Sequence, residues 1–229
     1  MVTILCVRFG KKYGKEYVER LRNMVSRHCT VPYEFACLTD DDRPIDGVRL
    51  IVQPNAGYQR GWWHKVHMFN PDLDVSERVL YFDLDTVIIS NIDKLVDYTT
   101  EFVGIRDFNR QFHPNWNILN SSIMTWLHQS ESDIWEKFAA NPQAAQTLAG
   151  DQDWIYRVAK DRIIYYPRDW VMSYKWEIRS KEELVFIDGV RKFKETKTPE
   201  IPKDCSVLVF HGDPKPEDVT DPVVVDNWR

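Results

Sequence analysis

The sequence predicts one α/β domain over residues 1–229, with a mostly parallel central sheet flanked by helices. Short apolar segments typical of buried strands alternate along the chain with segments whose apolar residues recur at helical spacing. Strands that alternate with helices indicate a parallel sheet covered on both faces. The composition, 43% hydrophobic and 28% charged residues, is that of a globular chain with a sizeable core, and no linker divides it.

The first half opens with a strand over residues 3–8, and the helix behind it carries apolar residues at helical spacing: Tyr17, Val18, Leu21, Met24 and Val25. Two further strands are expected over 34–38 and 48–52, separated by a turn-rich segment. A helix is expected from about 62 to 69. The clearest central strand is 78–82, and a second β-branched run covers 87–89.

In the second half, residues 102–106 and 118–126 are typical of strands, and residues 133–139 and 152–160 are typical of helices. A last strand over 207–210 ends at His211. Residues 192–203, rich in Lys, Glu, Thr and Pro, indicate a mobile excursion from the fold.

Charge and hydropathy exclude several classes of protein. The chain has 30 Lys plus Arg and 35 Asp plus Glu, and this net charge of −5 argues against general nucleic-acid binding. No apolar run approaches the roughly 20 residues that cross a bilayer, and no signal-peptide pattern is present, so a cytoplasmic protein without a membrane span is expected. The four cysteines lack a CxxC pair, which predicts reduced, mostly buried thiols.

Two carboxylates separated by one residue, Asp83 and Asp85, follow the strand 78–82. Side chains i and i+2 of an extended segment point to the same side, so both can converge on one cation. Close like charges raise one another's pKa, and a divalent metal ion resolves that conflict. A turn with two solvated aspartates is the alternative interpretation of so short a motif.

His211 follows an apolar strand in the same way, and the loop after it carries Gly212 and Lys215. Two carboxylates and an imidazole suit manganese or magnesium. Lys215 would then neutralise a phosphate held by the metal. Taken singly, His211 is more typical of a satisfied core or capping histidine than of a metal ligand.

Polar residues also stand at the start of a helix and inside a strand. Asp151 and Gln152 follow a glycine at the start of the helix 152–160. An acid at this position is stabilised by the helix dipole. Alternatively, the acid and the amide together bind the hydroxyl groups of a sugar. Asn120, Ser121 and Ser122 interrupt an apolar strand. Buried polar atoms require partners, which either a ligand or the fold supplies.

In their chain order these segments resemble the family-eight glycosyltransferases, the retaining, metal-dependent sugar transferases that include glycogenin and the bacterial lipopolysaccharide galactosyltransferases. Five ordered motifs carry the resemblance, which spans roughly residues 3–216 and points to small bacterial or viral members: 62–65, 83–85, 120–122, 151–153 and 211–216. It implies the GT-A fold, a Rossmann-like fold of nucleotide-diphospho-sugar transferases. Residues up to about 105 would form the nucleotide-binding half, and residues from about 106 to 229 the donor-sugar and acceptor half.

The resemblance implies roles for the charged residues. Asp83 and Asp85 resemble the metal-binding pair, with Asp83 also reaching the nucleotide ribose, and His211 resembles the third protein ligand. Lys65 matches the basic residue near the donor sugar and phosphate, and Lys215 matches the lysine that binds the diphosphate.

For the donor sugar and base, Asp151 and Gln152 resemble the pair that holds the sugar and faces its anomeric carbon. Tyr13 matches the aromatic residue that stacks on uracil, although Lys11 and Lys12 stand where the family usually has an acid. The remaining residues of the donor-binding set are Asn120, Ser121 and Gly212.

The expected activity is therefore metal-dependent transfer of a hexose from a nucleotide-diphosphate sugar, UDP-glucose or UDP-galactose, with Mn²⁺ or Mg²⁺ and with retained anomeric configuration. The acceptor, whether glycan, lipid, protein or modified base, is not indicated by the sequence, and neither is the oligomeric state. Five tryptophans in turn-flanked segments fit either core packing or a stacking platform for a carbohydrate acceptor: Trp62, Trp63, Trp116, Trp170 and Trp176.

Two other classes of function compete. Residues 83–87 also fit the nucleophile motif of haloacid-dehalogenase-type phosphatases, with Asp83 phosphorylated and Asp85 as acid/base. That motif normally lies on the first strand, and Ile155 stands where the later aspartate of that family is expected. A non-catalytic carbohydrate-binding module with calcium at Asp83 and Asp85 is the second alternative.

Overall fold

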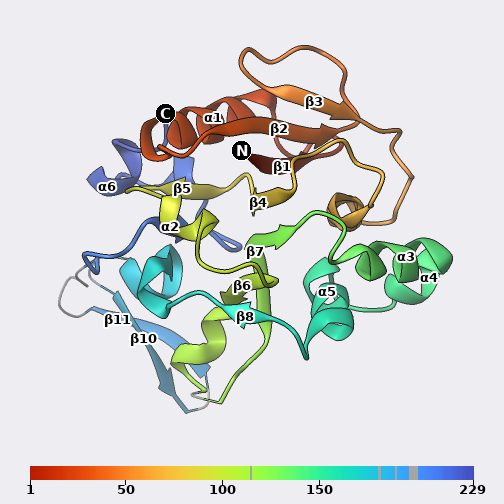
Figure 1. Ribbon diagram of the computed structural model, residues 1–229. Helices are drawn as coiled ribbons and strands as arrows, with labels where there is room; N and C mark the ends of the chain where they lie inside the picture. Colours follow the sequence, from red (N-terminus) through yellow and green to blue (C-terminus); the bar gives the residue numbers. More distant parts are fainter. Residues whose placement is uncertain (114, 180–181, 189, 196–200) are drawn as a thin grey trace.

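The central sheet of the computed structural model has seven strands, in the order β3 (Arg49–Val52), β2 (Tyr33–Thr39), β1 (Val2–Arg8), β4 (Arg78–Phe82), β7 (Leu119–Leu127), β6 (Val103–Arg106) and β8 (Ile164–Tyr165) (Figure 1). All run parallel except β7, which is antiparallel to its neighbours β4 and β6. The predicted α/β fold with a mostly parallel sheet is confirmed. The structure describes residues 1–113, 115–179, 182–188, 190–195 and 201–229.

A second, three-stranded sheet joins segments that are far apart in the sequence: β5 (Thr86–Ile88), β12 (Val207–Val209) and β9 (Val171–Ser173). Strand β12 lies between the other two, antiparallel to β5 and parallel to β9. Because Val209 pairs with Thr86, the residues that follow β12 lie beside the residues that precede β5. This pairing brings His211 to the turn that carries the two aspartates.

An antiparallel hairpin of β10 (Glu182–Ile187) and β11 (Val190–Glu195) forms a third sheet. The expected mobile excursion over 192–203 begins within β11. Residues 196–200 of that prediction lie outside the described residues.

The helical segments are α1 (Lys15–His28), η1 (Gly61–Phe69), α2 (Asp93–Val96), η2 (Phe108–Gln111), α3 (Ser132–Ala140), α4 (Pro142–Ala145), α5 (Asp151–Ala159), η3 (Arg168–Trp170), η4 (Tyr174–Ile178), η5 (Pro216–Asp218) and α6 (Pro222–Val225). The helix expected at 62–69 is present, but it is a 3₁₀ helix. Its period of three residues places side chains i and i+3 on one face. His64 and His67 accordingly have ring centroids 5.6 Å apart.

Both faces of the central sheet are buried, which explains why its strands read as continuous apolar runs. Side chains alternate along β1: Ile4 and Cys6 pack in a core with α1, whereas Leu5 packs in a second core with η1, α3 and α5. Figure 1 shows α3, α4 and α5 grouped on one side and α1 with the C-terminal α6 on another. The cavity described below therefore lies on a sheet that is rigidly held from both sides.

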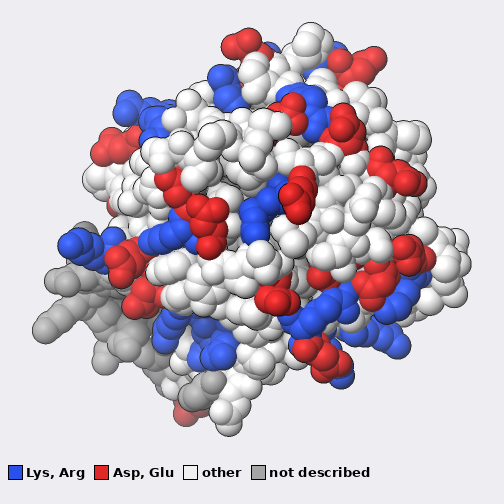
Figure 2. Space-filling view, viewed as in Figure 1, with Lys and Arg blue, Asp and Glu red and all other residues white. Residues whose placement is uncertain are grey.

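The four cysteines are free and buried, as predicted. No helix in the described part of the chain combines the length and apolarity needed to cross a membrane. On the face drawn in Figure 2, acidic and basic side chains are interspersed.

Two buried histidines of η1 hydrogen-bond to residues of the loop after β3. The Nδ1 atom of His67 donates to Gln53 Oε1 at 3.0 Å, and its Nε2 atom accepts from the hydroxyl of Tyr58 at 2.8 Å. The N–H of Ala56 donates to His64 Nε2 at 3.2 Å. Burial, with a smaller contribution from His64, lowers the pKa of His67 to about 4. The His67 ring is therefore neutral in the folded protein near pH 7 and uses both nitrogens to hold the loop.

This pKa predicts an acid-sensitive stability. Between the unfolded value of about 6.5 and the folded value of about 4, the unfolded chain binds more protons than the native one, so the free energy of unfolding falls as pH falls through this window. We expect His67→Gln to flatten that dependence. Urea denaturation at several pH values between 7 and 4.5 measures it, and an unchanged slope in the variant would contradict the assignment.

Candidate functional site

A cavity of about 600 Å³ opens where several strands end at their carboxyl ends. Its wall includes residues that follow β1, β4 and β12, which is where ligands bind in open α/β sheets. Most of the site residues predicted from the sequence line it: Tyr13, Lys65, Asp83, Asp85, Asp151, His211, Gly212 and Lys215.

The turn that carries the two aspartates is fixed by backbone and hydroxyl contacts. The N–H of Asp83 donates to Ser122 O on β7 at 2.8 Å, and the hydroxyl of Thr86 donates to Asp83 O at 2.8 Å. Asp85 is only 8% exposed. The alternative interpretation, a turn with two solvated aspartates, is therefore wrong for Asp85.

Lys65, on η1, joins two carboxylates in the wall of the cavity. Its Nζ atom lies 2.8 Å from Asp83 Oδ1 and 3.2 Å from Asp151 Oδ2, and it donates to Ser121 Oγ at 3.0 Å. The hydroxyl of Tyr81 donates to the same oxygen of Asp83 at 2.5 Å. Burial disfavours a charged lysine, but the charges of Asp151 and Asp83 outweigh it and raise the pKa of Lys65. The lysine therefore stays charged in a buried position.

Asp85 is held by a second lysine and by a phenol. Lys215 Nζ lies 2.6 Å from Asp85 Oδ2, and the Tyr13 hydroxyl donates to that oxygen at 2.9 Å. Burial and the neighbouring charge of Asp83 nevertheless raise the pKa of Asp85. Burial likewise opposes ionisation of Asp83, yet Lys65 lowers its pKa below the usual value.

The lysines and carboxylates in contact at this site do not pair one to one. Burial raises the pKa of Asp151, which shares Lys65 with Asp83. The three carboxylates of Asp83, Asp85 and Asp151 are thus in contact with two lysines, Lys65 and Lys215. A third lysine, Lys12, also lines the cavity, so the formal charges of its carboxylates and lysines balance.

His211 lies in the cavity wall and has partners within the fold. Its Nε2 atom is 2.7 Å from Ser173 Oγ, and its ring stacks on Phe108 with centroids 5.3 Å apart. Gly212 has φ +70°, a left-handed conformation that glycine adopts without strain. This glycine turns the chain from β12 toward Lys215.

The donor types around the cavity fit manganese or magnesium, since two carboxylates and an imidazole line it. Among the described residues, no three His, Cys, Asp or Glu side chains already form a metal-binding group. Instead, Asp83 and Asp85 each contact a lysine. The ligand set of Asp83, Asp85 and His211 therefore stays a prediction.

Three predicted site residues are outside the set that lines the cavity, and they support it through hydrogen bonds. Ser121 donates from Oγ to Asp151 Oδ2 at 3.1 Å and from its N–H to Gln152 Oε1 at 3.2 Å. Asn120 Oδ1 accepts from the N–H of Ser122 at 3.0 Å. The fold itself therefore supplies the hydrogen-bond partners of Asn120 and Ser121. The Asp151 carboxylate contacts Lys65 and Ser121, and the N-cap position of α5 is occupied by Gly150 instead of by Asp151.

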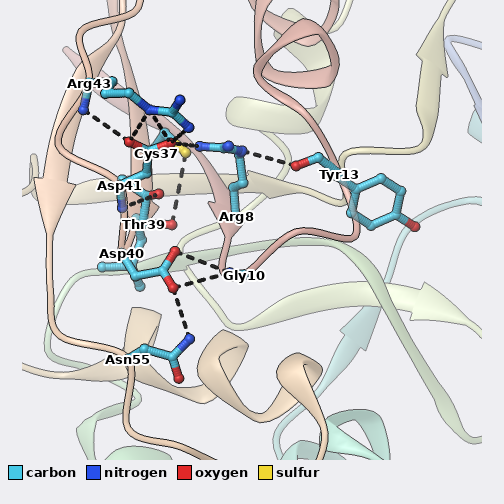
Figure 3. A network of polar contacts seen from close by, with 10 residues as sticks. Arg8, Gly10, Tyr13, Cys37, Thr39, Asp40, Asp41, Arg43 and Asn55 are labelled. Atoms are coloured by element: carbon cyan, nitrogen blue, oxygen red, sulfur yellow. Dashed lines mark hydrogen bonds and ion pairs between the residues drawn. The ribbon is translucent and has the colours of Figure 1, made fainter.

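The loop after β1 is anchored to the end of β2 by the network in Figure 3. Arg8 donates from Nε to Tyr13 O at 3.0 Å and from Nη1 to Asp41 Oδ2 at 3.0 Å. The N–H of Gly10 donates to Asp40 Oδ1 at 3.1 Å. The contact of Arg8 holds the backbone of Tyr13, whose ring lies in the cavity wall.

Two residues that hydrogen-bond predicted site residues, Tyr81 and Ser173, were not themselves predicted from the sequence. Tyr81 stands two positions before Asp83, and the alternation of side chains along β4 places both on one side, so a local pattern was available. Ser173 contacts His211 because β9 pairs with β12, with Ser173 opposite Val209. No local pattern indicates that pairing.

The fold and the position of this cavity define the class of structure: the chain has the GT-A glycosyltransferase fold. The glycosyltransferase GlyE of Streptococcus pneumoniae TIGR4 matches with a TM-score of 0.64 at 14% identity, over 94% of this chain and 56% of GlyE. The galactosyltransferase LgtC, solved with donor and acceptor sugar analogs, matches with a TM-score of 0.65 at 12% identity, over 93% of this chain and 88% of LgtC.

The bifunctional glycosyltransferase WbbM matches over 99% of this chain but 49% of its own length, with a TM-score of 0.63 and 12% identity. The chain thus spans about half the length of GlyE and of WbbM. No protein-family model and no curated protein sequence matches the chain. At these identities the matches show the fold alone.

The buried contacts of Lys65 with two carboxylates predict that removing this lysine strongly lowers stability. Lys65→Met leaves the carboxylates of Asp83 and Asp151 buried without their cation, so we expect a loss of about 3–5 kcal/mol in the free energy of unfolding. Adding Asp151→Asn should recover part of that loss. Urea denaturation at pH 7 measures both.

The matched control is Lys137→Met, which removes an exposed lysine that pairs with Asp133 within α3. Exposed pairs contribute less than about 1 kcal/mol. Equal effects of the Lys65 and Lys137 substitutions would contradict the assigned role of Lys65.

Proposed function

We propose that the chain is a metal-dependent glycosyltransferase that moves a hexose from a nucleotide-diphosphate sugar to an acceptor. The supporting observation is the meeting of three carboxylates and three lysines around one cavity of a GT-A fold. Carboxylates suit a divalent cation, and lysines suit phosphates. A diphosphate donor needs both in one place.

Asp83, Asp85 and His211 would hold Mn²⁺ or Mg²⁺, which when bound stabilises the charge of the leaving diphosphate. Lys215 is partly exposed at the cavity and carries the second positive charge toward the phosphates. Lys65 keeps Asp83 ionised by lowering its pKa. In enzymes, electrostatic stabilisation of this kind is usually the largest single contribution to catalysis.

The donor would lie across both halves of the domain. Residues up to about 105 supply the nucleotide side, with the Tyr13 ring as the wall for the base, for which we propose uracil. Residues from about 106 to 229 supply the sugar and acceptor side, with Gly212 beside the diphosphate and with Asn120 and Ser121 holding the sugar-binding residues in place. The sugar is glucose or galactose in this proposal.

Retention of configuration is proposed to proceed by attack of the acceptor on the same face as the leaving group. In-line attack would invert the anomeric centre, whereas in front-face attack the leaving phosphate takes the acceptor's proton. Asp151 Oδ2 is bonded to Lys65 and Ser121, which orients the carboxylate and reduces its nucleophilicity. Asp151, with Gln152 beside it, therefore stabilises positive charge at the anomeric carbon.

A thermal-shift screen tests donor binding. A ligand that binds the native state raises the melting temperature in proportion to its affinity and concentration. We expect UDP-glucose or UDP-galactose to raise it with Mn²⁺ present and to raise it less with a chelator. Phosphate release from p-nitrophenyl phosphate, without any response to nucleotide sugars, would favour the phosphatase alternative instead. Donor binding without release of UDP would favour a binding module.

Asp85→Ala tests the metal assignment. Removing one of two cation-binding carboxylates should reduce Mn²⁺-dependent release of UDP by at least ~100-fold, because several kcal/mol of charge stabilisation are lost. A coupled assay for UDP measures the rate. Asp42→Ala, which removes an exposed acid outside the cavity, is the control and should keep the wild-type rate. Full activity of the Asp85 variant would remove the metal assignment.

A further inference from the structure

A second cavity, of about 590 Å³, lies between the loop after β3 and the segment that begins with α4. The loop contributes Tyr58 and Gln59, and the α4 segment contributes Gln143, Gln146 and Thr147. None of the residues around it is used by the donor site proposed above.

The chemistry of this second cavity differs from that of the first. Its described lining has three primary amides, a phenol and an aliphatic hydroxyl, with no carboxylate, ammonium or guanidinium group. Amides and hydroxyls both donate and accept hydrogen bonds, as the hydroxyl groups of a sugar do. A neutral polyhydroxyl ligand therefore matches this lining better than a phosphate or a charged peptide.

Both walls of the cavity are held in place by the fold. The Tyr58 hydroxyl is bonded to His67 at 2.8 Å, and the N–H of Ala56 is bonded to His64 at 3.2 Å. On the opposite wall, Asn141 Oδ1 accepts from the N–H of Ala144 at 3.1 Å and caps α4. A site built on fixed walls loses little entropy when it binds a ligand.

One short segment, residues 59–62, contributes to both cavities. Gln59 lines the second cavity, and Trp62, three residues later, lines the first. Trp62 is 44% exposed, whereas its neighbour Trp63 is 1% exposed in the core. The Arg60 guanidinium lies 5.1 Å from the Trp62 ring centroid and donates to Ala149 O at 3.4 Å. This contact ties the segment to the chain that leads from Thr147 to Asp151.

We propose that the second cavity is the acceptor subsite and that it binds a sugar unit of a neutral oligosaccharide; this rests on the proposed glycosyltransferase function. The reacting sugar lies by Asp151 at the first cavity. The exposed face of Trp62 stacks against the oligosaccharide between the cavities, and the amides of Gln143 and Gln146 bind the next sugar. Aromatic rings supply the apolar face that a pyranose ring packs on. The acceptor class is thus an uncharged glycan of at least two sugar units.

The experiment compares wild type with Gln143→Ala/Gln146→Ala on an array of neutral and acidic glycans, with UDP-glucose or UDP-galactose and Mn²⁺. We expect wild type to modify neutral glycans of two or more units, and we expect the KM for the best of them to rise about tenfold in the variant. The donor-induced rise in melting temperature should persist in the variant. Glu136→Gln, an exposed change on neighbouring α3, is the control.

Modification of acidic glycans alone, modification of no glycan, or an unchanged KM in the Gln143→Ala/Gln146→Ala variant would each overturn the acceptor subsite. These outcomes are distinct from failure of the proposed function. If the proposed function is wrong, wild type itself will show neither a donor-induced rise in melting temperature nor release of UDP.

Discussion

The ion pairs of Lys65 are the interaction on which the site depends. One ammonium group joins a carboxylate that follows β4 to a carboxylate at the start of α5, and it is bonded to β7 through Ser121. A buried charge is costly unless it is paired and hydrogen-bonded, so any packing of these elements that left this lysine unpaired would be disfavoured. Asp83 and Asp151 are thereby held at fixed positions at the edge of the cavity.

The second constraint is the pairing of β12 between β5 and β9. It brings the chain that carries His211 and Lys215 to the turn that carries Asp85. The C-terminus then returns to α1, where Arg27 donates to Arg229 O at 2.8 Å. Residues from the middle of the sequence and from its C-terminal part thus meet at one site.

Much of this arrangement could be predicted because it is local. The strand that ends at Phe82, the acids that follow it and the apolar face of α1 are patterns within a few residues, and the structure has them. The 3₁₀ geometry of η1 and the antiparallel direction of β7 were not predicted. These depend on how segments far apart pack, which spacing in one sequence does not encode.

Other features were reached only by resemblance or were missed. The ordered motifs supplied a role for Lys65, but not its bridge to Asp151, because that bridge needs η1 and α5 to meet on one side of β7. The contact between Ser173 and His211 depends on strand pairing in the smaller sheet. In both cases tertiary packing, not local propensity, decides which polar groups become partners.

Titration of Mn²⁺ in the presence of UDP, followed by the electron paramagnetic resonance signal of the free ion, measures the central site most directly. A single ion should bind per chain when UDP is present, and Asp83→Asn should abolish that binding while the protein stays folded. A free-ion signal that is the same with and without the protein would contradict a cation and diphosphate site at these carboxylates.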